Sequence, residues 1–240
     1  MIYVLTGITI LFVAIGFILT EKNAKNLLSG YNTMSKEEKE QFNLLSYISF
    51  FRNFHYFLGF TNLFFGLLCY YLVGEKETGI FIGVYPVLAY IYFIWNSRSF
   101  TKKKNHSNVG IVVLVAALVF VIGVFAWGMQ ENQMFIEEAS IKIEGSYGEK
   151  ITSPQIAAIT LGASLPVLAR KTNGFALGGI KKGYFKTKEG ELVKLVVNSE
   201  ECPTILIETK EGKKIYFSDE KTVIEQLTKQ LQEKYSGVLN

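Results

Sequence analysis

The hydrophobic positions of this chain change their pattern close to Met129. Before this residue the apolar side chains form long runs, and after it they alternate with charged residues over short stretches. A hydrocarbon core of about 30 Å needs about 20 consecutive, mostly apolar residues in a helix. Four runs come close to this length, and we expect each to span a membrane: Ile2–Leu19, Phe54–Val73, Gly79–Trp95 and Gly110–Gly128.

The first apolar run is expected to stay in the mature protein. No basic residue precedes it and no small-x-small cleavage site follows Thr20, so it lacks two features of a secretory signal. The third run contains Pro86, which membrane helices tolerate where neighbours satisfy the freed carbonyl. We therefore expect a four-helix transmembrane domain over residues 1–129 and a second domain over residues 130–240.

The second domain shows the pattern of a mostly-β fold that ends in a helix. Short segments with strand character are separated by turns rich in Gly, Pro and Asn, as in an antiparallel sandwich or barrel. After Ser218, a predicted helix cap, the spacing changes to that of an amphipathic helix that Gly237 would end. The predicted strands are IKIEG, IAAITLG, LPVLARK, GYFKT, LVKLVVN, TILIET and KIYFS, and the apolar stripe of the helix is Val223, Ile224, Leu227, Leu231 and Tyr235.

The stretch GYNTMSKEEKEQF, residues 30–42, separates the first two apolar runs. Ser35 and Glu38 have the spacing of a capping box, so a helix is expected to begin at Lys36. Its apolar positions continue through Phe42 to Phe51 and predict an amphipathic helix along the membrane surface. The stretch is either a capped connector or a loop that binds a partner or ligand, and the site residues in the second case are Gly30, Tyr31, Asn32, Thr33, Ser35 and Glu38.

Basic residues predict the topology. Residues 1–129 hold ten Lys and Arg against six acidic residues, and nine of the ten lie in the first and third loops between the apolar runs. Short loops rich in Lys and Arg stay in the cytoplasm. We therefore expect the N-terminus and the distal domain outside the cytoplasm. The alternative is a cytoplasmic distal domain, because long domains can be translocated regardless of charge. Because the excess charge of +4 belongs to these loops, it gives no reason to expect a nucleic-acid partner.

Two regions of the chain resemble known bacterial families. KIEGSYGEKITSPQIAAITL, LPVLARKTNGFALGGIKKGYF and TILIETKEGKKIYFS resemble bacterial pleckstrin-homology domains, which implies a barrel closed at one end by the helix. LLSGYNTMSKEEKEQF resembles a bacterial membrane family of unknown function, and the Gly-Tyr-x-Thr turn is more distantly similar to the sporulation-delay immunity family. None of these resemblances implies a catalytic activity, and the first two imply no established ligand. We expect a multi-pass protein of the bacterial cytoplasmic membrane.

The Gly- and Lys-rich stretch near Gly179 offers a second candidate site. It lacks the Gly-x-x-x-x-Gly-Lys-Ser/Thr order of a phosphate-binding loop. Its glycines are either hairpin glycines of a twisted barrel or part of a contact with an anion or a lipid headgroup. The basic residues of such a contact would be Arg170, Lys171, Lys181 and Lys182.

Nothing in the chain predicts catalysis, a metal site or a cofactor. Cys69 and Cys202 belong to different domains, and His55 and His106 lack nearby ligand partners and are expected to be interfacial or solvated. The four apolar runs contain no Asp, Glu, Lys or Arg, although pumps and coupled transporters usually place ionisable groups there.

We therefore expect a non-catalytic membrane protein that presents a pleckstrin-homology-like binding module outside the cytoplasm for a protein, peptide or envelope ligand. The alternative is a toxin-immunity or signalling protein whose helical bundle captures a hydrophobic peptide, and a transporter component is the third candidate. The expected partners are the lipid bilayer and a protein or peptide, and the sequence leaves the oligomeric state open.

Overall fold

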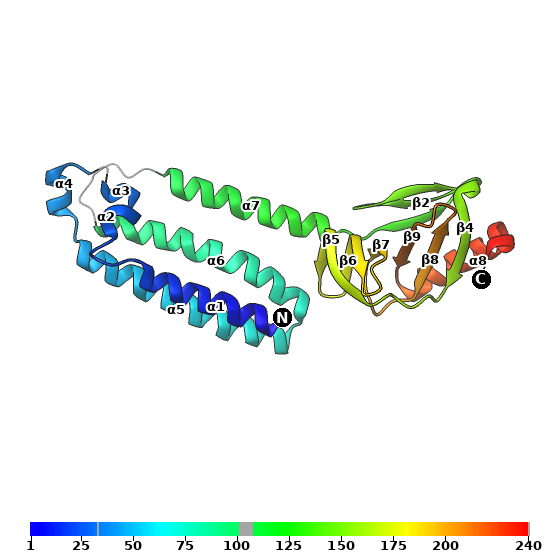
Figure 1. The fold of residues 1–240 in the computed structure, drawn as a ribbon, viewed down its shortest axis with the longest axis horizontal. Helices are drawn as coiled ribbons and strands as arrows, with labels where there is room; N and C mark the ends of the chain where they lie inside the picture. The colour runs from blue at the N-terminus through cyan, green and yellow to red at the C-terminus, as the bar shows by residue number, and fades with distance from the viewer. Residues whose placement is uncertain (33, 101–107, 240) are drawn as a thin grey trace. The chain divides into compact units, whose positions relative to one another are not determined.

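The structure is a computed structural model that describes residues 1–32, 34–100 and 108–239. Contacts divide the chain into two compact units, Met1–Gly123 (unit 1) and Val124–Asn240 (unit 2). Unit 1 is helical, whereas unit 2 is mostly β (Figure 1). The predicted order of a helical region followed by a β-rich region is therefore confirmed.

Each of the four apolar runs of the sequence forms a helix. Their lack of interior charge and their apolar character favour a helix that satisfies its own backbone hydrogen bonds. The helices in chain order are α1 (Ile2–Ile18), α2 (Ala24–Leu27), α3 (Ser29–Asn32), α4 (Lys36–Gln41), α5 (Leu44–Leu72), α6 (Glu75–Ser97) with the 3-10 turn η1 (Arg98–Phe100), and α7 (Val109–Met129).

Only two stretches of the described residues are long and apolar enough to cross a membrane, Glu75–Phe100 and Val109–Met129. The prediction of four spans is therefore wrong. Helix α1 has only 17 residues. Helix α5 begins ten residues before the predicted span, at Leu44 instead of Phe54, and so includes the polar Arg52 and Asn53 besides His55 and Asn62.

Helices α1 and α5 pack closely because α5 carries glycines where they meet. A Cβ on Gly59 would lie 3.2 Å from the backbone oxygen of Thr9, and one on Gly66 would overlap the side chain of Leu5. Between α5 and α6 the contact is aromatic. The rings of Phe50 and Phe93 stack with their centres 5.2 Å apart.

The predicted amphipathic helix from Lys36 to Phe51 is interrupted. Helix α4 ends at Gln41 and α5 begins at Leu44, with Phe42 in an extended conformation between them. The side chain of Asn43 accepts a hydrogen bond from the backbone N–H of Ser46 at 3.1 Å. Asn43 thus caps a new helix, a role for which Asn is well suited.

Unit 2 contains two separate sheets. The strands β1 (Gln133–Ile136), β2 (Ser140–Glu144) and β3 (Glu149–Thr152) form an antiparallel sheet in chain order. The second sheet has the order β4-β8-β9-β7-β6-β5. Its strands are β4 (Ile156–Leu161), β5 (Leu168–Leu177), β6 (Ile180–Thr187), β7 (Leu192–Val197), β8 (Thr204–Thr209) and β9 (Lys214–Ser218).

The two sheets do not close into the predicted barrel. Among the described strands, β4 and β5 lie at opposite edges of the larger sheet and do not pair with each other. In addition, β7 and β9 run parallel, with Leu195 opposite Tyr216, whereas the predicted barrel was antiparallel. The prediction of a closed barrel is therefore wrong, and the β-rich unit consists of two open sheets and a helix.

Helix α8 (Lys221–Tyr235) covers the main core of unit 2. Ile224, Leu227, Leu231 and Tyr235 are buried, as the predicted apolar stripe requires. Ser218 does not cap this helix, because it lies in β9 and its hydroxyl donates to the backbone oxygen of Ser199. The core also contains Ile205, Ile207, Ile215 and Phe217 from β8 and β9, all at 0% exposure.

Candidate functional site

A groove of about 630 Å³ lies between the three-stranded sheet and α8 in unit 2. Its walls combine apolar side chains with amides and paired charges, as ligand sites commonly do. The lining residues are Met134, Phe135, Ile136 and Glu137 around β1, Lys142 and Glu144 on β2, and Val223, Gln226, Leu227 and Gln230 on α8.

Strand β1 contributes an unpaired edge to this groove. Among the described strands it pairs only with β2, with Phe135 opposite Lys142. The N–H of Glu137 donates to the backbone oxygen of Ser140 at 2.9 Å. Because opposed residues of an antiparallel pair alternate in hydrogen bonding, the backbone groups of Met134 and Ile136 point away from β2. The groove therefore has backbone donors and acceptors along one wall.

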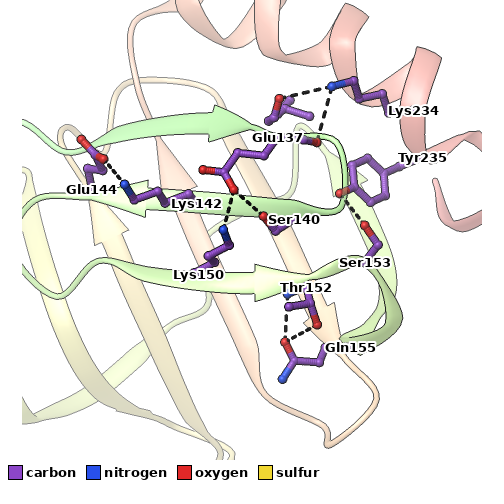
Figure 2. A network of polar contacts seen from close by, with 11 residues as sticks. Glu137, Ser140, Lys142, Glu144, Lys150, Thr152, Ser153, Gln155, Lys234 and Tyr235 are labelled. Carbon is purple, nitrogen blue, oxygen red and sulfur yellow. Dashed lines mark hydrogen bonds and ion pairs between the residues drawn. The ribbon is translucent and has the colours of Figure 1, made fainter.

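The last turn of α8 is fastened to the end of β1 and to the segment after β3. The ammonium group of Lys234 donates to the backbone oxygens of Ile136 and Glu137, each at 3.4 Å. The hydroxyl groups of Tyr235 and Ser153 lie 2.9 Å apart (Figure 2). These contacts hold the helix beside the strand at one end of the groove.

Charged groups around the groove are already paired. The carboxylate of Glu137 accepts hydrogen bonds from Lys150 at 2.6 Å and from Ser140 at 2.7 Å (Figure 2). These two bonds lower the pKa of Glu137, and the bond from Lys150 has the larger effect. Lys142 forms an ion pair with Glu144. The hydrogen bond within this pair raises the pKa of Lys142. A highly charged ligand therefore gains little from these groups.

The glycine-rich hairpin does not bring the four predicted basic residues together. Strands β5 and β6 meet at a turn that contains Gly178, whose φ of 55° suits glycine. Lys181 and Lys182 lie next to this turn, opposite Ala176 and Phe175, while Arg170 and Lys171 lie four to six residues back along β5. At about 3.3 Å per residue, the two pairs are separated by about 17 Å.

Two of these four basic side chains are engaged within unit 2. Lys181 forms an ion pair with Glu200, and Lys182, at 1% exposure, donates to the backbone oxygen of Gln130. Burial lowers the pKa of Lys182 to about 8. Arg170 and Lys171 are exposed. A contact with an anion or a lipid headgroup stays a prediction. Of the four basic residues, Arg170 and Lys171 are the two whose side chains are available for it in this conformation.

Tyr31 and Phe42 belong to a small aromatic site in unit 1. The predicted capping box is present: the N–H of Glu38 donates to Ser35 Oγ at 3.2 Å, and its carboxylate accepts from the N–H of Ser35 at 3.0 Å. Gly30, Tyr31 and Asn32 belong to α3, whereas Thr33 lies outside the described residues. A pocket of about 300 Å³ lies beside them, lined by Leu27, Leu28, Tyr31, Met34, Phe42, Tyr47 and Ser97.

Groups of His, Cys, Asp or Glu that could hold a metal ion are not found in the described parts of the chain. His55 is not solvated, because its ring is buried and lies between the backbone oxygen of Phe51, at 2.7 Å, and the hydroxyl of Tyr90, at 3.1 Å. Its position at a membrane interface stays a prediction. His106 is outside the described residues. Cys69 and Cys202 are unpaired thiols.

Strand β1, and with it the groove, was not predicted from the sequence. The string QMFIEEASIKIE gives only a weak signal, because Met134, Phe135 and Ile136 are consecutive apolar residues and do not alternate with polar ones. A short apolar run cannot be told from a helix segment by its period alone. In the structure, the predicted strand IKIEG is the second strand of a hairpin with β1.

Comparisons with known proteins inform only unit 1. Residues 6–101 match a family described as "Domain of unknown function (DUF3784)", in agreement with the predicted resemblance to an unknown-function family. The predicted pleckstrin-homology-like fusion is not supported by any family match. No curated protein matches the chain. No solved structure matches it either.

Proposed function

We propose that this protein is a non-catalytic binding protein, held in a membrane by α6 and α7, whose β-rich unit receives a polypeptide ligand in the groove beside α8. The observation that carries the proposal is the groove itself. It combines apolar residues, an unpaired strand edge and amide side chains, and its charges are internally paired. These features suit the binding of a ligand, and the residues that line the groove suggest no catalytic role.

The proposed location of unit 2 is outside the cytoplasm. The segment between α6 and α7 contains Arg98 and Lys102–Lys104, and short basic loops favour the cytoplasmic side. Since α7 leads from this segment into unit 2, a spanning α7 would place the groove on the opposite side. An envelope or extracellular polypeptide is then the class of ligand that could reach it.

The test is site-specific photo-crosslinking in the cells that make the protein. A benzophenone amino acid replaces Gln226, which lines the groove, or Gln232, which is also exposed on α8 but does not line it. We expect an adduct with one dominant polypeptide from position 226 and none from position 232, identified by mass spectrometry. The same adducts from both positions, or no polypeptide adduct from position 226, would contradict the proposal.

A second candidate function is capture of a hydrophobic peptide by the helices of unit 1. An apolar hollow of about 260 Å³ lies between α5 and α6, lined by Phe54, Phe57, Leu58, Tyr85, Ala89 and Tyr92. Benzophenone in place of Phe57 tests this alternative, because its exposed ring lies at the hollow. A peptide adduct from position 57 without one from position 226 would favour it over the groove.

A further inference from the structure

The free edge of β1 determines what kind of polypeptide the groove can take. We infer that the ligand is an extended segment that adds to β1 as a further strand, with apolar side chains at alternate positions. This inference rests on the proposed function and names the ligand class of the same groove. Strand addition to an exposed edge is a general mode of peptide recognition, in which backbone hydrogen bonds give affinity and side-chain pockets give specificity.

The backbone of β1 supplies three groups for such a strand. The alternation of hydrogen-bonded pairs leaves the N–H and C=O of Met134 and the N–H of Ile136 directed to the free edge. The C=O of Ile136 is directed there as well but accepts from Lys234. Lys234 therefore marks the end of the available edge, and the added strand would lie beside residues 133–136.

The opposite wall suits the far side of the same strand. Gln226 and Gln230 are exposed on α8 and line the groove. Each amide group both donates and accepts hydrogen bonds, so the pair can satisfy the backbone groups of the ligand that face away from β1. A ligand without a regular backbone would gain less from this arrangement of donors and acceptors on two walls.

The side chains of the groove explain the expected alternation. Met134 is buried and belongs to the same core as Leu227, with Val223 packed against it. Phe135 lies on the other face of β1, at 44% exposure, opposite Lys142. Since successive side chains of a strand point to opposite faces, every second ligand residue would turn toward Val223 and Leu227. Its neighbours would lie over Phe135.

A second copy of this chain fits the edge less well than a single extended segment. Each copy carries α8 beside its own β1, where Lys234 fastens it. Pairing β1 with β1 would bring two helices into one groove, whereas strands in a sheet lie about 4.8 Å apart. The occupant to which the structure points is therefore an extended segment of another polypeptide.

The test begins with the full-length protein in lipid nanodiscs. A phage-displayed library of random linear peptides is selected on it after depletion on empty nanodiscs, and the most enriched peptide is synthesised. We expect apolar residues at alternate positions in the enriched sequences. Hydrogen exchange should then show new protection at the amides of Met134 and Ile136, with little change at Phe135, whose N–H already faces β2.

Three protein variants locate the binding. Ile136→Pro removes one outward N–H donor and should weaken binding about three- to tenfold, while Ile136→Val keeps the donor and should bind normally. The double variant Gln226→Arg with Gln230→Arg should bind the peptide more weakly than Ile136→Pro does. The control Gln232→Arg, on the same helix but away from the groove, should bind as the wild type does. Thermal unfolding of each variant shows whether unit 2 remains folded.

Two sets of results would overturn the inference. If no peptide is enriched over empty nanodiscs, or if the selected peptide binds the groove variants as well as the wild type, the ligand is not an added strand at β1. Protection of Met134 that depends on protein concentration without peptide would instead identify a second copy as the occupant. The proposed function fails separately, by the absence of a groove-specific adduct at position 226.

Discussion

Phe217 in unit 2 and Phe60 in unit 1 are the same type of side chain in opposite surroundings. Phe217 is at 0% exposure within a core built from two sheets and α8, whereas Phe60 is 64% exposed on α5. Other large apolar side chains of unit 1, including Phe64 on α5 and Val119 on α7, are also more than half exposed. Unit 2 thus buries most of its large apolar residues against one another, whereas unit 1 leaves many of them for its surroundings to cover.

This difference has a consequence for how each unit is stabilised. Burial of apolar surface is the dominant favourable contribution to folding in water. Unit 2 draws this contribution from its own contacts. The exposed apolar side chains of unit 1 gain it only in an apolar phase such as lipid or against a partner, and large exposed apolar patches mark such interaction surfaces.

The largest expected effect is that of truncating the core of unit 2. Phe217→Ala should reduce the free energy of unfolding of unit 2 by about 3–5 kcal/mol, because it removes a fully buried ring and leaves a cavity. Denaturant unfolding of the protein in nanodiscs, followed by the near-UV signal, measures it. Phe60→Ala is the matched substitution in unit 1 and should change the free energy of unfolding little. Equal losses from both would remove the distinction between the units.

The next effect concerns the helix contact inside unit 1. Gly59→Val would place side-chain atoms against the backbone of α1 at Thr9 and should destabilise the α1–α5 pair by about 1–3 kcal/mol. Crosslinking between cysteines placed on the two helices reports their separation. Gly7→Val is the control, since a Cβ at Gly7 meets no atom within 4 Å. Unchanged crosslinking in Gly59→Val would contradict this prediction, because it would show that α1 and α5 accommodate the larger side chain without separating.

A smaller effect should appear in the pH dependence of unit 2. Burial lowers the pKa of Lys182 from 10.5 to about 8, so between these values the unfolded chain binds this proton more strongly than the folded one. The free energy of unfolding should therefore rise with pH in this window, by up to about 1.4 kcal/mol per pH unit for one proton. Lys182→Met should lack this contribution. The same slope in both proteins would show that the ammonium is not buried.

The smallest expected effect is at the capping box. Ser35→Ala removes the acceptor for the N–H of Glu38 and should cost about 0.5–1 kcal/mol, which destabilises only the six-residue helix α4. Faster hydrogen exchange at the amides of Glu38 and Lys39 would show it, while Ser35→Thr keeps the acceptor and should exchange nearly as the wild type does. A fall in the stability of unit 2 would contradict such a local role.

Local patterns predicted much of the fold. The apolar runs gave four helices, the spacing from Ser35 to Glu38 gave the capping box, and seven predicted strands overlap β2 and β4–β9. These features depend on neighbouring residues in the chain. The buried face of α8 was also predicted, because the 3.6-residue period places Ile224, Leu227 and Leu231 on one side.

Long-range features were not predictable in the same way. The parallel pairing of β7 with β9, the two open sheet edges and the burial of Lys182 against Gln130 all depend on which strands meet. A lysine in a polar stretch is ordinarily exposed, so its sequence neighbours gave no sign of burial. The groove required both the missed strand β1 and its position beside α8, which no local pattern contains.

In the proposed arrangement, α7 spans a membrane and unit 2 lies on its outer side. Thiol labelling at three positions tests it in a background of Cys69→Ser and Cys202→Ser. Any outer membrane is first removed. A membrane-impermeant maleimide should then label Lys229→Cys in intact cells and Asn108→Cys only after permeabilisation. Val119→Cys should stay unlabelled in both cases. Labelling of Asn108→Cys before permeabilisation together with protection of Lys229→Cys would reverse the orientation, and labelling of all three in intact cells would contradict a spanning α7.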